Sequence, residues 1–174
     1  MQKIEIRLAN RTDAEYIALL GRVTFQETFG HYFRDKNDLL EYYNRTFSVE
    51  KIRSSLEKSD NVYWISLVDD LPVGYAKLKL NSSIDFSTST NICQLQKIYV
   101  LKDFLSMKIG WELQNNLLAA ASEKGFEKIW LSVLGSNERA INFYNRSGFE
   151  KIGDHDFQIG KEHFKFIVMM KSLK

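Results

Sequence analysis

The stretch NERAINFYNRSGF, residues 137–149, reads as a short helix with both of its ends marked. Asn137 is a preferred N-cap residue, because its side-chain oxygen can accept a hydrogen bond from an amide of the first helical turn. Gly148 can adopt the left-handed conformation of a C-terminal cap without a steric penalty from a Cβ atom. Phe149 supplies the apolar contact that often accompanies such a cap. The sequence therefore predicts a helix over residues 137–147.

Strands and helices are predicted to alternate on both sides of this helix. The strands have alternating or continuous apolar residues, and an upstream helix has apolar residues in four-residue steps. The predicted strands are CQLQKIYV (93–100), EKIWLSV (127–133), FEKIGDHDF (149–157) and HFKFIVMMK (163–171), and the helical stripe is Ile109, Leu113, Leu117 and Ala121. The resulting β-α-β-α-β segment indicates a sheet covered by helices on both faces.

The first half of the chain is predicted to add three strands and three helices. The strands are KIEIRL (3–8), VYWISLVD (62–69) and VGYAKLKL (73–80), and the helices span residues 12 to about 27, 37–47 and 48–58. Thr12 and Glu15 form a capping-box pattern, Asn37 and Ser48 are predicted N-caps, and Pro72 is predicted to lie in a tight turn. Together the elements predict one α/β (α+β) domain over residues 1–174.

Composition excludes several classes of protein. Of 174 residues, 44% are apolar, and 24 basic against 22 acidic residues give a net charge of +2. Because no long block carries one sign of charge, neither nucleic acid nor a membrane surface is an expected partner. The single cysteine, Cys93, cannot form an internal disulfide, and three scattered histidines suggest no metal site. The N-terminus lacks the apolar block of a signal peptide, so a cytoplasmic location is expected.

The turn LKDFLSMKIG (101–110) lies between a predicted strand and a predicted helix, where chains often place a phosphate-binding loop. Such loops favour glycine, which lets the main chain approach a phosphate, and this turn contains only Gly110. Amides at the helix N-terminus can still bind phosphate if the backbone angle φ stays negative. Lys108 can add a charge-assisted contact or point into solvent.

Three motifs on these elements resemble those of the GNAT superfamily of N-acetyltransferases, and the resemblance spans nearly the whole chain. The most specific is N-x-x-A-I-x-F-Y-x-x-x-G-F, which begins at Asn137. The second is L-x-x-I-Y-V over residues 95–100, and the third is the pyrophosphate loop Q/R-x-x-G-x-G/A, which residues 105–110 match poorly. The resemblance implies the GNAT fold, a central mixed and mostly antiparallel twisted sheet of about seven strands with helices on both faces. It also implies acetyl-CoA as co-substrate and no metal.

A narrower resemblance is to the PaiA-type polyamine N-acetyltransferases. It lies in TFQETFGHYF (24–33), DDLPVGYAKLKLN (69–81), WLSV…N (130–137) and GDHDFQIGKEHFKFIVMMK (153–171). It implies that the acceptor is a small amine that resembles a polyamine. Two departures from that group each remove a carboxylate: Gln94 replaces an acidic residue, and Leu134–Asn137 replaces W-E-K-N.

Acetyl transfer to an amine requires a proton for the departing thiolate, and Tyr144 is the predicted general acid. A phenol with a pKa near 10 is protonated at neutral pH and can donate that proton. The alternative is that Phe143 and Tyr144 both pack in the core. Residues implied to contact acetyl-CoA come from the strand, the loop and this helix: Ile98, Tyr99, Val100, Leu105, Ser106, Met107, Lys108, Ile109, Gly110, Trp111, Asn137, Ala140, Phe143 and Arg146. Asn137 can serve as cap and cofactor contact at once.

The acceptor and the general base are less defined. Phe25, Phe29, Tyr32 and Gln94 are the predicted acceptor residues, although the three aromatic residues fit packing equally well. Candidate bases, by residue type alone, are His31, His155, Glu27 and Asp35, and a water chain is an alternative. Glu27, Asp35, Asp38 and Glu41 would suit a cationic amine or form a solvated face.

The sequence is therefore compatible with two functions. One is an acetyl-CoA-dependent N-acetyltransferase that acts directly on the primary amine of a small molecule. The other is a non-catalytic, regulatory CoA-binding domain on the same scaffold, suggested by the altered loop and the missing carboxylates. A homodimer through the C-terminal strands is compatible with both.

Overall fold

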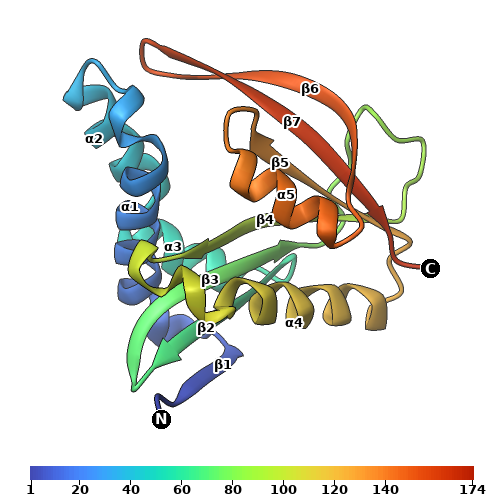
Figure 1. Ribbon diagram of the computed structural model, residues 1–174, viewed down its shortest axis with the longest axis horizontal. Coiled ribbons are helices and arrows are strands. Elements are labelled where there is room, and N and C mark those ends of the chain that lie inside the picture. The colour runs from blue at the N-terminus through green and yellow to red at the C-terminus, as the bar shows by residue number, and fades with distance from the viewer.

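A computed structural model, which describes residues 1–174, contains one seven-stranded sheet in the order β1-β2-β3-β4-β5-β7-β6 (Figure 1). The strands are β1 (Ile4–Leu8), β2 (Asn61–Val68), β3 (Leu71–Lys79), β4 (Ile92–Val100), β5 (Lys128–Leu134), β6 (Glu150–Ile159) and β7 (Glu162–Ser172). Neighbouring strands are antiparallel except β4 and β5, which are parallel. The predicted mixed, mostly antiparallel sheet is confirmed.

Helices cover both faces of the sheet (Figure 1). They are α1 (Ala14–Phe29), α2 (Lys36–Thr46), α3 (Val49–Leu56), α4 (Ile109–Glu123) and α5 (Glu138–Arg146). Side chains alternate between the two faces along a strand. On β3, Tyr75 is buried under α1, α2 and α3, whereas Ala76 and Leu78 are buried with the α4 residues Leu113 and Leu117. The sheet therefore separates an aromatic-rich core under α1–α3 from a mainly aliphatic core under α4 and α5.

The start of α1 differs from the predicted capping box. Asn10 accepts a hydrogen bond from the Thr12 amide at 2.8 Å, and Asp13 accepts one from the Asn10 amide at 2.9 Å. These bonds close a short 3₁₀ turn, Arg11–Asp13, before α1 begins. The box predicted from Thr12 and Glu15 is wrong because the turn shifts the capping residues toward the N-terminus.

The other helix ends are mostly as predicted. Asp35, rather than Asn37, caps α2, because its carboxylate accepts a hydrogen bond from the Asn37 amide at 2.9 Å. Ser48 and Asn137 are confirmed as caps, since each accepts from the amide three residues later at 3.2 Å. Gly148 has the predicted left-handed backbone, with φ of 83°.

The turn between β2 and β3 is built by Asp69 and Asp70, whose φ angles are 48° and 65°. Two consecutive left-handed residues are typical of the tight turns that match the twist of antiparallel strands. Pro72 lies within β3 beside a shift in strand register, so its predicted place in the turn is wrong. A proline without an amide hydrogen is tolerated next to such an irregularity.

The strands β4 and β5 pair over only three residues each. Pairing runs from Ile92 opposite Lys128 to Gln94 opposite Trp130, and beyond these residues the strands diverge. Here β4 also contains a bulge, because Lys77 of β3 lies opposite Lys97 while Leu78 lies opposite Leu95. The edge of β4 that faces β5 therefore has no strand partner over residues 95–100.

Candidate functional site

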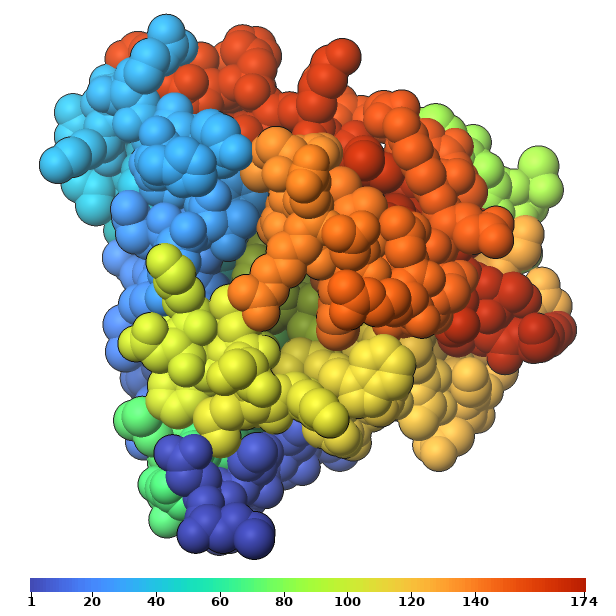
Figure 2. Space-filling view, viewed as in Figure 1, coloured from blue at the N-terminus to red at the C-terminus, as the bar shows by residue number.

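A cleft of about 970 Å³ lies between the diverging ends of β4 and β5. In Figure 2 it is the hollow between α1 (blue), the segment before α4 (yellow) and α5 (orange), with β4 (olive green) at its base. We use two names for its sides. The α4–α5 side is lined by residues of the range 102–111 and of the range 137–146, and the α1 side by residues of the range 24–32.

The α4–α5 side contains a left-handed turn where α4 begins. A 3₁₀ helix, Lys102–Met107, is followed by Lys108 with φ of 60°, and α4 starts at the next residue. The condition that φ stays negative is therefore not met at Lys108, which occupies the first glycine position of the pyrophosphate pattern. No side chain caps α4, so the amides of its first turn are free at the cleft. A Cβ atom added to Gly110 would meet only Val100, at 3.9 Å, so packing does not require this glycine.

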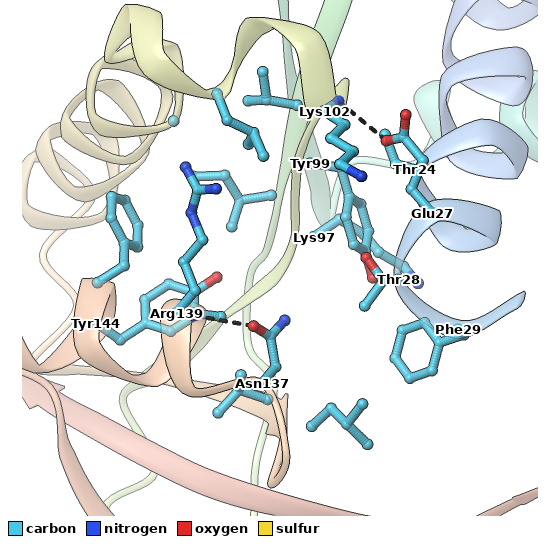
Figure 3. Close-up of a pocket in the computed structure, with 18 of the residues that line it drawn as sticks. Thr24, Glu27, Thr28, Phe29, Lys97, Tyr99, Lys102, Asn137, Arg139 and Tyr144 are labelled. Atoms are coloured by element: carbon cyan, nitrogen blue, oxygen red, sulfur yellow. Dashed lines mark hydrogen bonds between the residues drawn. The ribbon is translucent and has the colours of Figure 1, made fainter. Parts of the chain in front are cut away.

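Helix α5 projects Tyr144 into the cleft from the same side (Figure 3). The side chain is buried, and burial, with a smaller contribution from the nearby Tyr99 phenol, raises the pKa of Tyr144 above its ordinary value. Its hydroxyl is therefore protonated throughout the neutral range. The Phe143 ring lies edge-on to the Trp111 ring, 6.4 Å between centroids, and thereby connects α5 to the start of α4.

The α1 side carries polar side chains and aromatic rings. Glu27 accepts a hydrogen bond from the Lys102 amide at 3.1 Å, drawn as a dashed line in Figure 3. The Tyr32 hydroxyl lies 3.0 Å from the Ser136 hydroxyl, so this contact connects the 3₁₀ turn that follows α1 to the segment before α5. Phe29 also lines the cleft. Side chains, rather than main-chain groups, thus define this part of the cleft.

Most of the predicted site residues line the cleft. They are Tyr144, Ile98, Tyr99, Val100, Leu105, Ser106, Lys108, Gly110, Trp111, Asn137, Ala140, Phe143, Arg146, Phe29 and Tyr32. Two predicted cofactor residues do not. Ile109 is only 1% exposed and Met107 packs against the same aliphatic core, because both side chains point away from the cleft and under α4. Their side chains therefore do not line the cleft, and their predicted contact with the cofactor, which depends on main-chain amides, stays a prediction.

Two predicted acceptor residues also lie outside the lining. Phe25 is 3% exposed and stacks on Phe29 with centroids 4.5 Å apart, so it belongs to the aromatic core. Gln94 lies at the paired end of β4 and accepts a hydrogen bond from the Ser82 hydroxyl at 3.0 Å. Neither side chain lines the cleft, so the geometry gives no support to their prediction as acceptor residues.

Of the four candidate bases, two line the cleft and two do not. Glu27 and His31 line the cleft. His155 instead contacts the Ser132 hydroxyl at 2.8 Å from strand β6, and Asp35 pairs with Lys161 at 2.6 Å. The cluster of carboxylates predicted to suit a cationic amine is thus dispersed, since among its members only Glu27 lines the cleft.

Sequence analysis missed several cationic residues of the cleft. They are Lys97, Lys102 and Arg139. Lys97 is half-buried, and burial lowers its pKa to about 8. Its place in β4, two residues from Tyr99, carried a usable signal, because side chains two apart share one face of a strand. Lys102 and Arg139 carry no comparable signal, since a charged residue after a strand or in a first helical turn is usually solvated.

The structure contains no group of three or more His, Cys, Asp or Glu side chains placed to hold a metal ion. None of its helices is long and apolar enough to cross a membrane.

Comparison with known proteins assigns this arrangement to a known group. The sequence profile described as "Acetyltransferase (GNAT) family" matches residues 24–149. An uncharacterized N-acetyltransferase of Lactobacillus delbrueckii subsp. lactis is 26% identical over 172 residues, which cover 97% of this chain and 96% of the relative. An N-alpha-acetyltransferase of Sulfurisphaera tokodaii is 25% identical over 158 residues, covering 87% and 83%.

Among solved structures, the chain is similar to the PaiA N-acetyltransferase from Thermoplasma acidophilum, crystallised in complex with coenzyme A. The TM-score is 0.79 over 98% of this chain and 99% of that chain, with 21% sequence identity. At this identity the similarity establishes the fold, and the predicted GNAT fold is confirmed.

Proposed function

This chain belongs to the Acetyltransferase (GNAT) family, whose members use acetyl-CoA, and on that premise we propose that it acetylates a primary amine of a small acceptor. The observation that carries the proposal is the cleft between β4 and β5, which joins a free strand edge, a free helix N-terminus and a protonated tyrosine. These are the groups that a pantetheine arm, a pyrophosphate and a leaving thiolate require.

The free edge of β4 is suited to the amides of the pantetheine arm. Over residues 95–100 this edge lacks a strand partner, and an extended ligand with amide groups can add to it as a short strand would. The free amides at the start of α4 are suited to the pyrophosphate, because the positive end of a helix dipole and its unpaired N–H groups favour anions. Lys108 and Arg139, which line the cleft, add positive charge. Acetyl-CoA bound there supplies the activated acetyl group.

In the proposed reaction, the acceptor amine attacks the thioester carbonyl carbon, the new C–N bond forms and the C–S bond breaks. Tyr144 donates its proton to the departing sulfur, since its phenol is protonated and lies within the cleft. Glu27, the only carboxylate in the lining, takes the amine proton directly or through a water molecule. The products are an acetylated amine and CoA, and no covalent enzyme intermediate is needed.

The predicted polyamine-like acceptor has weaker support than acetyl transfer itself. Recognition of a chain with several ammonium groups requires several carboxylates, and Glu27 is the only carboxylate that lines the cleft. The support comes from the likeness to the PaiA enzyme, which at 21% identity concerns the fold. We therefore propose a primary amine as the acceptor and treat the rest of the acceptor separately below.

The proposal is tested by two measurements on the same preparation. Thermal unfolding with and without CoA reports binding, and release of free thiol from acetyl-CoA in the presence of amines reports turnover. We expect CoA to raise the melting temperature and at least one primary amine to be acetylated. Binding without turnover across amino acids, peptides and polyamines would favour the non-catalytic CoA-binding alternative, and absence of binding would refute both.

A further inference from the structure

The base of the cleft carries a lysine that has no acidic partner. Lys97 lines the cleft, but no carboxylate lies within 4 Å of its ammonium group and it donates no hydrogen bond to another residue. Buried ammonium groups are normally paired, because removal of a charge from water is unfavourable unless another charge or dipole compensates. The mechanism above gives Lys97 no role.

The position of Lys97 directs its side chain toward the α1 side. On β4, Ile98 and Val100 contact the aliphatic core under α4, whereas Tyr99 contacts the aromatic core under α1–α3. Lys97 shares the face of Tyr99, and its ammonium nitrogen lies 5.8 Å from that ring's centroid and 5.3 Å from that of Phe47. In Figure 3 the side chain extends from β4 toward the region of Thr28 and Phe29 on α1. It therefore lies away from the start of α4, where phosphates are proposed to bind.

The surroundings of Lys97 increase the positive potential there. Lys77 lies directly opposite on β3, and it too has no acidic partner within 4 Å. The one carboxylate of the lining, Glu27, is engaged by the Lys102 amide. Aromatic faces compensate a cation only in part. A cationic acceptor group would be repelled at this place, and an anionic group would be attracted.

Resting on the proposed function, we propose that Lys97 binds a carboxylate of the acceptor, so that the substrates are amines that also carry a carboxylate, such as amino acids or similar compounds. The amine then points toward Tyr144 and the acetyl donor, while the carboxylate lies between β4 and α1. The Tyr99 and Thr28 hydroxyls, on the two elements that border this place, are available as further donors. Polyamines lack the anionic group and are poor substrates.

Matched ligands that differ only in the carboxylate test this proposal. The probes are N-acetyl amino acids, their carboxamides, the corresponding N-acetyl aminophosphonates and an N-acetylated polyamine, titrated into the protein with saturating CoA by calorimetry. We expect the acids to bind at least about ten-fold more tightly than the amides, the difference that one charge-assisted hydrogen bond typically gives. The same ratio is expected in kcat/KM when the free amines are the acceptors.

Two variants locate the effect. In Lys97→Met the acid-to-amide ratio is expected to fall to about one, with the change in KM rather than kcat. Lys77→Met is the matched control, since Lys77 lies on the same sheet face one strand away but does not line the cleft, and it should keep most of the preference. Circular dichroism and CoA binding confirm that both variants are folded.

Several results would overturn the proposal. Equal binding of acids and amides, tighter binding of the polyamine or the phosphonates, or no binding of any acid while CoA binds would each do so. A loss of kcat in Lys97→Met with an unchanged acid-to-amide ratio would also do so, because it would assign Lys97 to the chemical step. If CoA does not bind to the wild-type protein, the proposed function itself is refuted. This result is distinct from failure of the carboxylate proposal, in which CoA binds but acids are not preferred.

Discussion

The two sides of the cleft present different kinds of polar group, main-chain groups on one side and side chains on the other. On the α4–α5 side, the free amides of α4 and the free edge of β4 are main-chain groups, which any amino-acid sequence can supply. On the α1 side, the polar groups belong to side chains such as Glu27 and Tyr32, and the Lys97 side chain extends toward this side from β4. A relative can therefore keep the first side through many substitutions, whereas single substitutions change the second. If the co-substrate and the acceptor bind as proposed above, this difference accounts for a family that shares a co-substrate and differs in acceptors.

Tyr144 is the exception on the α4–α5 side, because there a single side chain is proposed to perform chemistry. We expect Tyr144→Phe to lower kcat by about 100-fold or more, since it removes the proton donor, while the dissociation constant of CoA stays unchanged. Steady-state kinetics and calorimetry with CoA measure the two quantities. Tyr16→Phe, at an exposed position of α1, is the control. An unchanged kcat would remove Tyr144 from the mechanism.

On the α1 side, Glu27 is the side chain that is proposed to take part in the chemistry, as the base. Glu27→Gln keeps an oxygen that can accept the Lys102 amide hydrogen but cannot take a proton, so we expect kcat to fall by about ten-fold or more near neutral pH. The deficit should shrink at high pH, where the amine loses its proton without help. A pH–rate profile of both proteins measures this. His31→Asn is the comparison, and a larger loss there would make His31 the base instead.

Substitution of Lys108 tests how much of the CoA affinity proposed for the α4–α5 side comes from main-chain groups alone. Lys108→Ala removes the charge and keeps a left-handed residue, whereas Lys108→Gly removes the charge and the penalty of about 1 kcal/mol for that conformation. We expect both variants to bind CoA a few-fold more weakly at low salt, and Lys108→Gly to be the more stable of the two. Calorimetry at two salt concentrations and urea unfolding measure these effects. If affinity is unchanged in Lys108→Ala, the side chain points into solvent.

The smallest effect concerns the pH dependence of stability that arises from two lysines of the sheet, Lys97 of β4 and Lys77 of β3. Burial lowers the pKa of Lys97 to about 8, and burial together with Lys97 lowers that of Lys77 to about 7. Between pH 7 and about 9 the unfolded chain binds more protons at these lysines, so the free energy of unfolding should rise with pH. Above that range the Cys93 thiol opposes the rise, because burial raises its pKa to about 12 while the unfolded thiol ionises. Urea unfolding of wild type and Lys97→Met measures the slope, which should be smaller in the variant. Equal slopes would contradict this account of Lys97.

Much of the fold was predictable from the sequence, because apolar periodicity and caps are local signals. Ser48, Asn137 and Gly148 lie where these signals place them. The errors have local physical causes too. At α1 the capping residues precede the helix by a 3₁₀ turn, which the pattern of Thr12 and Glu15 cannot reveal.

The site was predictable to the extent that it follows from motifs and helix geometry. Tyr144 could be placed in the cleft because it is in a specific motif, whereas the loop pattern could not reveal that the Ile109 side chain is buried, since its neighbours in the loop do line the cleft. Nor could it reveal that Gln94 lies outside the lining, because the point at which β4 leaves β5 is set by tertiary pairing. The sequence indicated that Lys97 shares a face of β4 with Tyr99, but not that this lysine is buried, because its burial comes from the packing of α1 and α2 over the sheet.

The short pairing of β4 with β5 also bears on how cooperatively the protein unfolds. Strands β1 to β4 come from the first part of the chain and β5 to β7 from the last part, and we call these two parts of the sheet its two units. Their strands pair over only three residue pairs, beside which the Glu127 amide donates a hydrogen bond to the Asn91 carbonyl at 3.0 Å. A ligand that spans the cleft contacts both units and stabilises only the state in which they are joined. Co-substrate binding is thereby expected to couple the two units, so that local opening of either one comes to require opening of both.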